Sequence, residues 1–476
     1  MPARKLVPLL AASVVAKLAL DHIADADVFF HLRLGLDALA TRRLPTTLSY
    51  SWSLPGVPRL PIDWLAQLFL AAAYRLGGFP GVGLLKGALT VALVLLVHAI
   101  VRRRSGDNPR AGALVLALFV AAASTQFFAR PLAFGALLLA GVIWLLDRIA
   151  AGRSREAFLL PLVFALWPNT YGGWPVGLGL TGAALADALL PFAWGPFRAA
   201  GLAPEARRRL AVGFALSLPA LLLNPSGLAL VVRPFWLLRH RAALSVFDEW
   251  SPVPWTSPGL WALLIMAALL LLAGVRGKGP LRPYDLPILA ASFVMALRSA
   301  NQHLVCAIVA APALAGPLGA WFSPEGFLEN RRVNAAVAAL AMLLFGAIGV
   351  ERLRAWPMDI RTAAPVEAVE ALECAGLAGT RGFAYFDWGG YLVFRRIDTY
   401  VDGRLEPFLD SGIFDRYLEV ERTGDMAWLE ANQVRWLLEK ARSPLDRAAE
   451  GRPGWHLGYR DQGSVLWLRD AAAGNP

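Results

Sequence analysis

The sequence is poor in charge and in cysteine. Only 17% of its 476 residues are Asp, Glu, Lys or Arg, whereas 57% are hydrophobic and 17 are tryptophan. This composition excludes an ordinary soluble enzyme and is typical of an integral membrane protein. Cys306 stands in an apolar run and Cys374 in a polar region, so the two cysteines offer no disulfide framework and are assigned no role.

The N-terminal sequence also lacks the features of a cleavable signal peptide. The first apolar run, at 6–20, is not followed by a small-residue cleavage site, so it is expected to remain as a membrane helix. Arg4 and Lys5 precede it. By the positive-inside rule the N-terminus is therefore cytoplasmic.

Long apolar runs predict about eleven transmembrane helices. They lie at 6–20, 82–101, 111–128, 131–147, 157–169, 174–192, 210–223, 258–275, 285–298, 302–322 and 333–350. With this topology, 18 Lys and Arg residues fall on the cytoplasmic side and 10 on the other side before residue 352, which agrees with the positive-inside rule.

Two further apolar runs, 62–76 and 226–239, are short and contain arginine. They are predicted to lie in the outer interface as juxtamembrane helices. The alternative is that either one crosses the membrane and shifts the count by a helix.

The sequence changes character at about residue 352. Short β-type runs at 382–386 and 464–468 alternate with helical stretches, which indicates a soluble α/β domain over 352–476. The first domain, 1–351, includes an external loop at 21–81. An odd number of spans places the second domain outside the cytoplasm. The net charge of +11 then reflects cytoplasmic loops that contact anionic lipid, and no nucleic-acid partner is expected.

The start of the external loop holds an unusual group of ionisable residues. Asp21, His22, Asp25, Asp27 and His31 directly follow the first apolar run, where such groups are costly and often functional. Asp27 and His31 would share one face of a helix, and Asp37, further along the same stretch, is expected to be a solvated helix position. The alternative is that Asp25 and Asp27 cap a juxtamembrane helix.

Several short motifs follow one another along the chain: DADVFFHLRLG, RLPTTLSYSWSLPG, DWLAQLFLAAAYRLGG, ARPLAF, LWPNTYGGW, NPSG, DEWSP and DWGGYLVF followed by YVDGR. Their order resembles that in bacterial membrane proteins of the GT-C superfamily. Members of this group are glycosyltransferases that use polyprenyl-phosphate-linked sugars, similar to protein mannosyltransferases and the aminoarabinose transferase. The resemblance implies a multi-pass protein of the bacterial inner membrane that builds the cell envelope.

The resemblance also implies roles for individual residues. Asp27, with Asp25 as competitor, matches the general base of an inverting transfer. His31 would support it, either by a hydrogen bond or, with Asp25 and Asp27, as ligand of a divalent cation such as Mg²⁺ or Mn²⁺. Arg298 and Arg130 are candidates to stabilise the lipid phosphate, or else they contact lipid phosphates as snorkelling side chains.

Other polar residues of the external segments are candidates for substrate binding, and two turn-like motifs are expected to be structural. The first group consists of Glu249, His303 and Asn169. Gly389-Gly390 and Asp402-Gly403-Arg404 are predicted to form turns between strands, with Asp402 and Arg404 as an ion pair.

Two other classes of function remain open. A transporter or flippase for a lipid-linked substrate would place ionisable groups near the bilayer midplane and often contains repeats, but no internal repeat is visible here. A non-catalytic scaffold of an envelope-polysaccharide system would tolerate loss of both Asp25 and Asp27.

Overall fold

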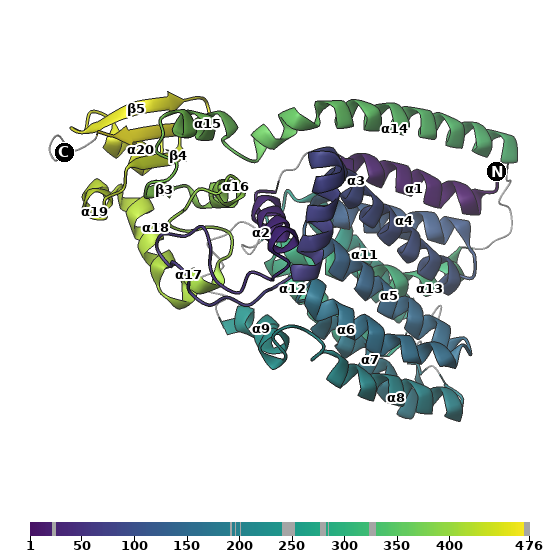
Figure 1. Cartoon of the computed structure of the whole chain (residues 1–476). Helices are drawn as coiled ribbons and strands as arrows, with labels where there is room; N and C mark the ends of the chain where they lie inside the picture. The colour runs from purple at the N-terminus through teal and green to yellow at the C-terminus, as the bar shows by residue number, and fades with distance from the viewer. Residues whose placement is uncertain are drawn as a thin grey trace. The chain divides into compact units, whose positions relative to one another are not determined.

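The chain forms two compact units that are each built from two segments of the sequence. The computed structural model describes residues 1–20, 25–190, 193–195, 197–199, 201–239, 253–276, 282–283, 285–322 and 330–470. One unit, here called the helical unit, comprises 1–21 and 83–354, and the other, the mixed unit, comprises 22–82 and 355–476. Figure 1 shows the elements of both.

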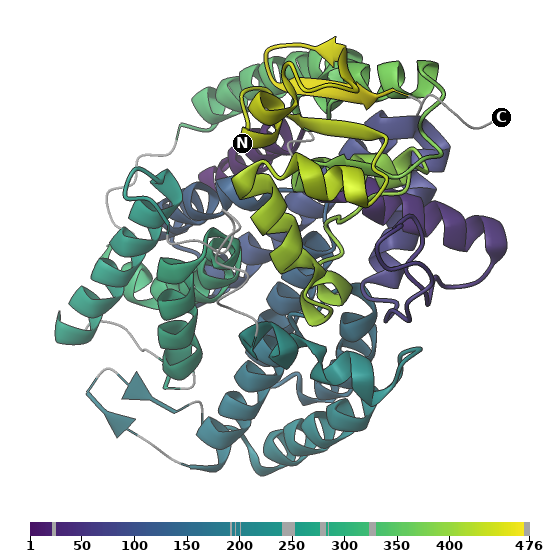
Figure 2. The ribbon, with the colours of Figure 1, turned by 90° about the vertical axis from the view of Figure 1, so that its left-hand side faces the viewer.

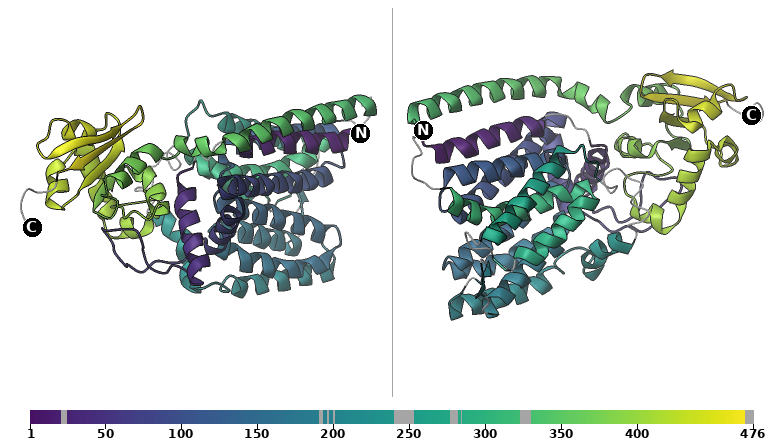
Figure 3. Two further views of the ribbon diagram at one scale, coloured as in Figure 1. Left: turned by 45° about the horizontal axis from the view of Figure 1, so that its top comes forward. Right: turned by 180° about the vertical axis from the view of Figure 1, so that it is seen from behind.

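The helical unit is a bundle of α-helices. Its described helices are α1 (Ala3–Leu20), the second part of α3 (Trp64–Arg104), α4 (Pro109–Ala123), α5 (Leu132–Ala150), α6 (Leu160–Thr170), α7 (Trp174–Leu189), α8 (Pro204–Ala220), α9 (Leu228–Arg239), α11 (Pro258–Arg276), α12 (Asp285–Arg298), α13 (His303–Trp321) and most of α14 (Arg331–Asp359). Short 3-10 turns lie at Ser124–Gln126, Ser154–Leu159 and Ala300–Gln302, and a two-stranded hairpin joins β1 (Ala193–Trp194) to β2 (Phe197–Arg198). Most of the long helices run alongside one another (Figure 3).

Helix α13 is central to this bundle. It packs against α4, α11 and α12, and its alanine-rich sequence is buried almost throughout, because small side chains let neighbouring helices approach closely. Asn108 caps α4 by accepting hydrogen bonds from Arg110 and Ala111. Its side-chain amide donates to the carbonyl of Phe322 at 2.6 Å, which joins the start of α4 to the end of α13.

Among the described residues, six helices are long and apolar enough to cross a membrane: Trp64–Arg104, Pro109–Gln126, Leu132–Ala150, Pro258–Arg276, Ala300–Trp321 and Arg331–Arg352. The outer faces of some carry exposed leucine, such as Leu271 and Leu343, as expected where lipid replaces water. The protein is therefore a multi-pass membrane protein. Each of the eleven predicted spans coincides with a helix or helical stretch, and the count of about eleven stays a prediction.

The predicted stretches 62–76 and 82–101 both fall on α3 (Trp64–Arg104), which has an internal break. Gly77 and Gly78 have non-helical dihedral angles, and φ of Gly78 is +61°, a value that glycine adopts without the strain of a Cβ atom. A Cβ on Gly81 would lie 2.2 Å from the carbonyl oxygen of Ala73. The break separates the predicted juxtamembrane stretch 62–76 from the predicted span 82–101.

The mixed unit contains a four-stranded sheet in the order β3-β4-β6-β5. The strands are β3 (Gly382–Ala384), β4 (Trp436–Lys440), β5 (Trp455–Arg460) and β6 (Ser464–Arg469). Strands β3 and β4 are parallel, and the other pairs are antiparallel. The runs predicted as strands at 382–386 and 464–468 correspond to β3 and β6.

Short helices accompany this sheet, and Figure 2 shows the unit from another side. They are α15 (Val366–Cys374), α16 (Gly389–Phe394), α17 (Glu406–Asp410), α18 (Ile413–Thr423), α19 (Met426–Ala431) and α20 (Pro444–Ala449), with 3-10 turns at Ile360–Thr362 and Phe386–Trp388.

The first loop is part of the same unit. Its helix α2 (Asp27–Thr41) packs against α16. The Trp52 indole donates to the carbonyl of Gly382 at 2.8 Å, and the backbone of Thr399 exchanges hydrogen bonds with Tyr50 and Trp52. These contacts join residues more than 300 positions apart in the sequence.

Glu439 on β4 should make the mixed unit less stable as pH rises. Its side chain is fully buried; burial raises the pKa of this carboxyl well above 4.5, and the charge of Glu421 adds to the effect. A carboxyl group whose pKa is higher in the folded than in the unfolded protein destabilises the fold once the pH rises above its pKa in the unfolded protein. Glu439→Gln should therefore raise the apparent melting temperature at about pH 8 more than at about pH 5. An equal effect at both pH values would contradict this.

Candidate functional site

The two candidate carboxylates have different surroundings at the start of α2. Asp25 is 3% exposed, and its Oδ1 accepts a hydrogen bond from the backbone N–H of Asp27 at 2.9 Å. Asp27 is the first residue of α2 and is partly buried. Asp25 thus fixes the backbone just before the helix through an Asx-type hydrogen bond, whereas the N-cap itself is Ala26 without a side-chain cap and Asp27 is the first residue of the helix.

Two glycines of the C-terminal segment make room for this helix start. A Cβ on Gly403 would lie 2.5 Å from Asp27 Oδ1 and 2.9 Å from the Phe30 ring. A Cβ on Gly390 would lie 2.6 Å from the carbonyl oxygen of Ala26. Both distances are too short for a side chain, so the Asp27 carboxylate lies directly against the Asp402-Gly403-Arg404 turn.

His31 is held on the same helix by a polar neighbour. Its Nδ1 lies 3.2 Å from the side-chain amide nitrogen of Gln67, which also donates to the carbonyl of Ile62. His31 is 7% exposed. The contact with Gln67 orients the imidazole ring, because a hydrogen bond at one ring nitrogen fixes the tautomer at the other.

The predicted metal ligands do not form a metal site in the part of the chain that the structure describes. Among those residues, no three His, Cys, Asp or Glu side chains are grouped so that they could hold an ion. Asp25, Asp27 and His31 therefore do not fit a divalent cation as a set of three. Asp21 and His22 lie outside the described residues.

Asp37 was expected to be a solvated helix position, and this expectation is wrong. Its side chain is 25% exposed and pairs with Arg33 at 2.6 Å, and its other oxygen accepts from the Tyr50 hydroxyl at 2.9 Å. Burial, then the hydrogen bond to Asp37, raise the pKa of Tyr50. Asp37 connects α2 to the rest of the first loop and has a structural role.

The turn-like motifs of the C-terminal segment agree only in part with expectation. Asp402 and Arg404 form the predicted ion pair at 2.7 Å, with both side chains fully buried. The Arg404 guanidinium also donates to the carbonyl of Ser49 at 2.7 Å. Gly389-Gly390 was predicted to be a turn between strands, but these residues begin helix α16 instead, where a Cβ on Gly389 would collide with the Val401 carbonyl.

The other candidate residues that the structure describes lie in the helical unit. Arg130 precedes α5, with its guanidinium over the Phe128 ring, and the side-chain amide of Asn169 donates to the carbonyls of Ala165 and Leu223. Arg298 is exposed at the end of α12, and His303 is fully buried at the start of α13. Their roles in substrate binding stay predictions. Glu249 lies outside the described residues.

The contact between α2 and the first part of α3 should be sensitive to any added atom. A Cβ on Gly35 would lie 2.2 Å from the backbone oxygen of Gln67, and backbone cannot move aside as a side chain can. Gly35→Ala should cost about 1–3 kcal/mol of stability, measured as a lower apparent melting temperature in detergent. Gly346→Ala on α14, where a Cβ meets nothing within 4 Å, is the control and should cause no loss.

The fold of the chain is similar to that of two kinds of solved structure, each less than 15% identical to it in sequence. The chain is similar to ArnT, the aminoarabinose transferase, from Cupriavidus metallidurans in a structure bound to undecaprenyl phosphate, with 14% identity, a TM-score of 0.55 and 98% of each chain covered. It is also similar to the oligosaccharyltransferase AglB from Archaeoglobus fulgidus, tethered to an acceptor peptide, with 11% identity, a TM-score of 0.55, and 98% of this chain and 74% of that chain covered.

A second AglB structure, in complex with an inhibitory peptide and a dolichol-phosphate, matches with a TM-score of 0.54 at 11% identity, over 98% of this chain and 74% of that chain. No protein-family model and no curated protein sequence matches the chain. At these identities the likeness establishes the fold alone. The mostly helical, multi-pass fold that the motif resemblance implies is confirmed, whereas the count of about eleven spans and the separate C-terminal domain stay predictions.

Proposed function

We propose that this protein is a glycosyltransferase that moves a sugar from a polyprenyl-phosphate-linked donor to an acceptor on the extracytoplasmic side of the membrane. The observation that carries the proposal is the match to ArnT over 98% of both chains, in a structure that contains undecaprenyl phosphate. The AglB structures contain an acceptor peptide or dolichol-phosphate. Both kinds of ligand fit a reaction that joins a lipid-borne donor to a second substrate.

In the proposed reaction Asp27 is the general base. Its carboxylate takes the proton of the acceptor nucleophile as that atom attacks the anomeric carbon of the sugar. The new glycosidic bond forms on the face opposite the phosphate, and the bond from the anomeric carbon to the phosphate oxygen breaks. The polyprenyl phosphate or diphosphate leaves with the electron pair, and the configuration at the anomeric carbon inverts.

The surroundings of the two carboxylates favour Asp27 over Asp25 as this base. Asp25 is almost completely buried and accepts the backbone N–H of Asp27, whereas Asp27 is only partly buried. His31, held against Gln67, is proposed as its support. Arg298 and Arg130 are proposed, on the sequence pattern alone, as the cations that stabilise the charge developing on the leaving phosphate.

The proposed site requires that the first loop and the C-terminal segment face away from the cytoplasm. We expect a reporter that is active only in the periplasm to be active when fused after Pro476, and one that is active only in the cytoplasm to be active when fused before Met1. We expect this topology because the loops assigned to the cytoplasm hold an excess of Lys and Arg residues. A C-terminal fusion that is active only in the cytoplasm would overturn this topology and the proposed position of the site.

A transfer assay tests the proposed activity. The purified protein is reconstituted in liposomes with a panel of radiolabelled polyprenyl-phosphate sugars, and membranes of a strain that lacks the protein supply the acceptor. We expect label to move from the lipid to a membrane component, with release of polyprenyl phosphate. Movement of intact labelled lipid between leaflets without transfer would favour a transporter. Absence of both transfer and lipid movement, together with retention of a partner protein, would favour a scaffold.

A further inference from the structure

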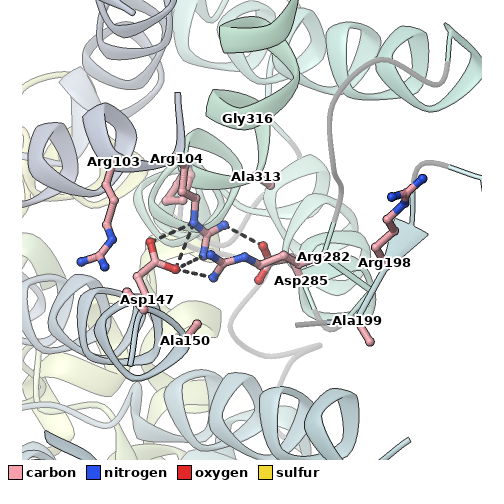
Figure 4. A pocket seen from close by; sticks show the side chains of 12 residues that line it. Arg103, Arg104, Asp147, Ala150, Arg198, Ala199, Arg282, Asp285, Ala313 and Gly316 are labelled. Carbon is pink, nitrogen blue, oxygen red and sulfur yellow. Dashed lines mark hydrogen bonds and ion pairs between the residues drawn. The ribbon is translucent and has the colours of Figure 1, made fainter. Parts of the chain in front are cut away.

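The helical unit contains a cavity of about 400 Å³ whose wall carries a cluster of charged residues. Four arginines, Arg103, Arg104, Arg198 and Arg282, line it together with Asp147 and Asp285. The remaining lining residues are alanine, proline and glycine. None of the residues proposed for sugar transfer is among them. Figure 4 shows the cavity and the hydrogen bonds within it.

Two of the arginines are fixed in place by the two aspartates. Arg104 pairs with Asp147 at 3.0 Å and with Asp285 at 2.7 Å, and all three side chains are at most 8% exposed. Arg282 also pairs with Asp147. Arg104 thus joins the end of α3 to α5 and α12. Such a network holds its guanidinium groups in one geometry, so that these side chains lose less conformational entropy when a ligand binds.

The other two arginines leave the cavity with an excess of positive charge. Arg103 and Arg198 are exposed, and neither forms an ion pair with a carboxylate in the described part of the chain. In Figure 4 they lie on opposite sides of the Arg104 network. The lining therefore has two more cations than anions.

The helix dipoles reduce this excess without removing it. The C-terminal ends of α3 and α5 each contribute about half a negative charge, and the N-terminus of α12 contributes about half a positive charge. More than one positive charge remains. A ligand with one or two negative charges would neutralise this positive charge, and the guanidinium groups of Arg103 and Arg198 would then pair with it.

We propose that this cavity binds the phosphate group of a small organic phosphate ester, through Arg103 and Arg198 together with the guanidinium groups that Asp147 and Asp285 hold. Arginine is suited to this task because its planar fork matches two phosphate oxygens. The volume, about that of the smallest ligand pockets, and the alanine-rich wall leave room for an organic group on the phosphate.

The phosphate ester can come from a lipid headgroup or from a soluble compound. Two of the candidate spans reach this region at their C-terminal ends, at Arg104 and at Ala150, and a third contributes Pro312, Ala313 and Gly316 from its second half. Basic pockets between the ends of membrane helices are suited to anionic lipid headgroups. The excess of cations in the segments that connect these helix ends predicts that the cavity lies on the cytoplasmic side. The experiment must therefore include both kinds of probe.

Native mass spectrometry of the full-length protein in detergent separates the two sources. The probes are phosphatidylglycerol, phosphatidylcholine as the lipid without net charge, and inorganic phosphate as the soluble probe. The variants are the double substitution Arg103→Gln/Arg198→Gln and, as matched control, Arg208→Gln, which removes an exposed arginine of α8 that does not line the cavity. Both variants should fold, because the network around Asp147 is kept.

We expect phosphatidylglycerol or inorganic phosphate to bind the wild-type protein and to bind the double variant at least about tenfold more weakly, since two charge-assisted hydrogen-bonding groups are lost. Arg208→Gln should bind as the wild type does. Preference for phosphatidylglycerol over phosphatidylcholine identifies a lipid site, and binding of inorganic phosphate alone identifies a soluble ligand. Absence of binding by either probe, or equal affinities in the double variant and the wild type, would overturn the proposal.

Discussion

Replacing Asp27 by asparagine should lower the rate of sugar transfer by about 10²- to 10⁴-fold, the usual contribution of a general base. Asparagine has nearly the same shape and can occupy the space against Gly403, but it cannot take up the proton of the acceptor. The apparent melting temperature should therefore change little. The measurement is the rate of transfer from a polyprenyl-phosphate sugar by purified variants at saturating donor.

The control for this experiment must be an aspartate of the mixed unit whose side chain makes no stabilising hydrogen bond or ion pair among the described residues. Asp37 is unsuitable, because it pairs with Arg33 and Tyr50. Asp415, exposed in the first turn of α18, is the better choice, and Asp415→Asn should keep full activity. Asp25→Ala, which removes the acceptor of the Asp27 N–H, should weaken the start of α2 and lower both activity and melting temperature. Full activity in both Asp27→Asn and Asp25→Asn would rule out catalysis by this pair.

Replacing Gly403 by alanine should lower the rate of transfer by about 10²-fold, a larger effect than the modest loss of stability expected from a Cβ 2.9 Å from the Phe30 ring. The added Cβ would meet Asp27 Oδ1 at 2.5 Å, and the short aspartate side chain would rotate to avoid it. The carboxylate is then present but misplaced. We expect the loss in kcat to exceed any change in KM for the donor, and the melting temperature to fall only modestly, so that the variant stays folded at the assay temperature.

Alanine substitutions at two other glycines distinguish a misplaced Asp27 carboxylate from a general loss of stability. Gly390→Ala would bring a Cβ within 2.6 Å of the Ala26 backbone oxygen, so it should lower the melting temperature together with the activity. Gly379→Ala, where a Cβ meets nothing within 4 Å, should change neither. If Gly403→Ala retained wild-type kcat, the Asp27 carboxylate would have no required position against this turn.

The helices and the strands could be predicted because they depend on patterns within short stretches of sequence. Long apolar runs indicated each helix of the predicted spans. Alternating apolar residues indicated β3 and β6. These signals are local, and the physical chemistry that produces them is the need to satisfy backbone hydrogen bonds within the helix or sheet.

The surroundings of Asp27 could not be predicted in this way. The contact with Gly403 joins residues 376 positions apart, and Gln67 reaches His31 from another helix. Nothing in the spacing of either residue points to its partner. The same limit explains the wrong expectation for Asp37, whose ion pair with Arg33 at i and i+4 was visible in the sequence, whereas its hydrogen bond from Tyr50 was not.

The most direct test of the proposed function is a structure of the protein with undecaprenyl phosphate bound. The account predicts that the phosphate lies on the side of the membrane that holds the first loop, at a distance from the Asp27 carboxylate that a single sugar residue can bridge. A phosphate bound on the opposite side of the membrane, or one separated from Asp27 by packed side chains, would contradict the assignment of Asp27 as the general base.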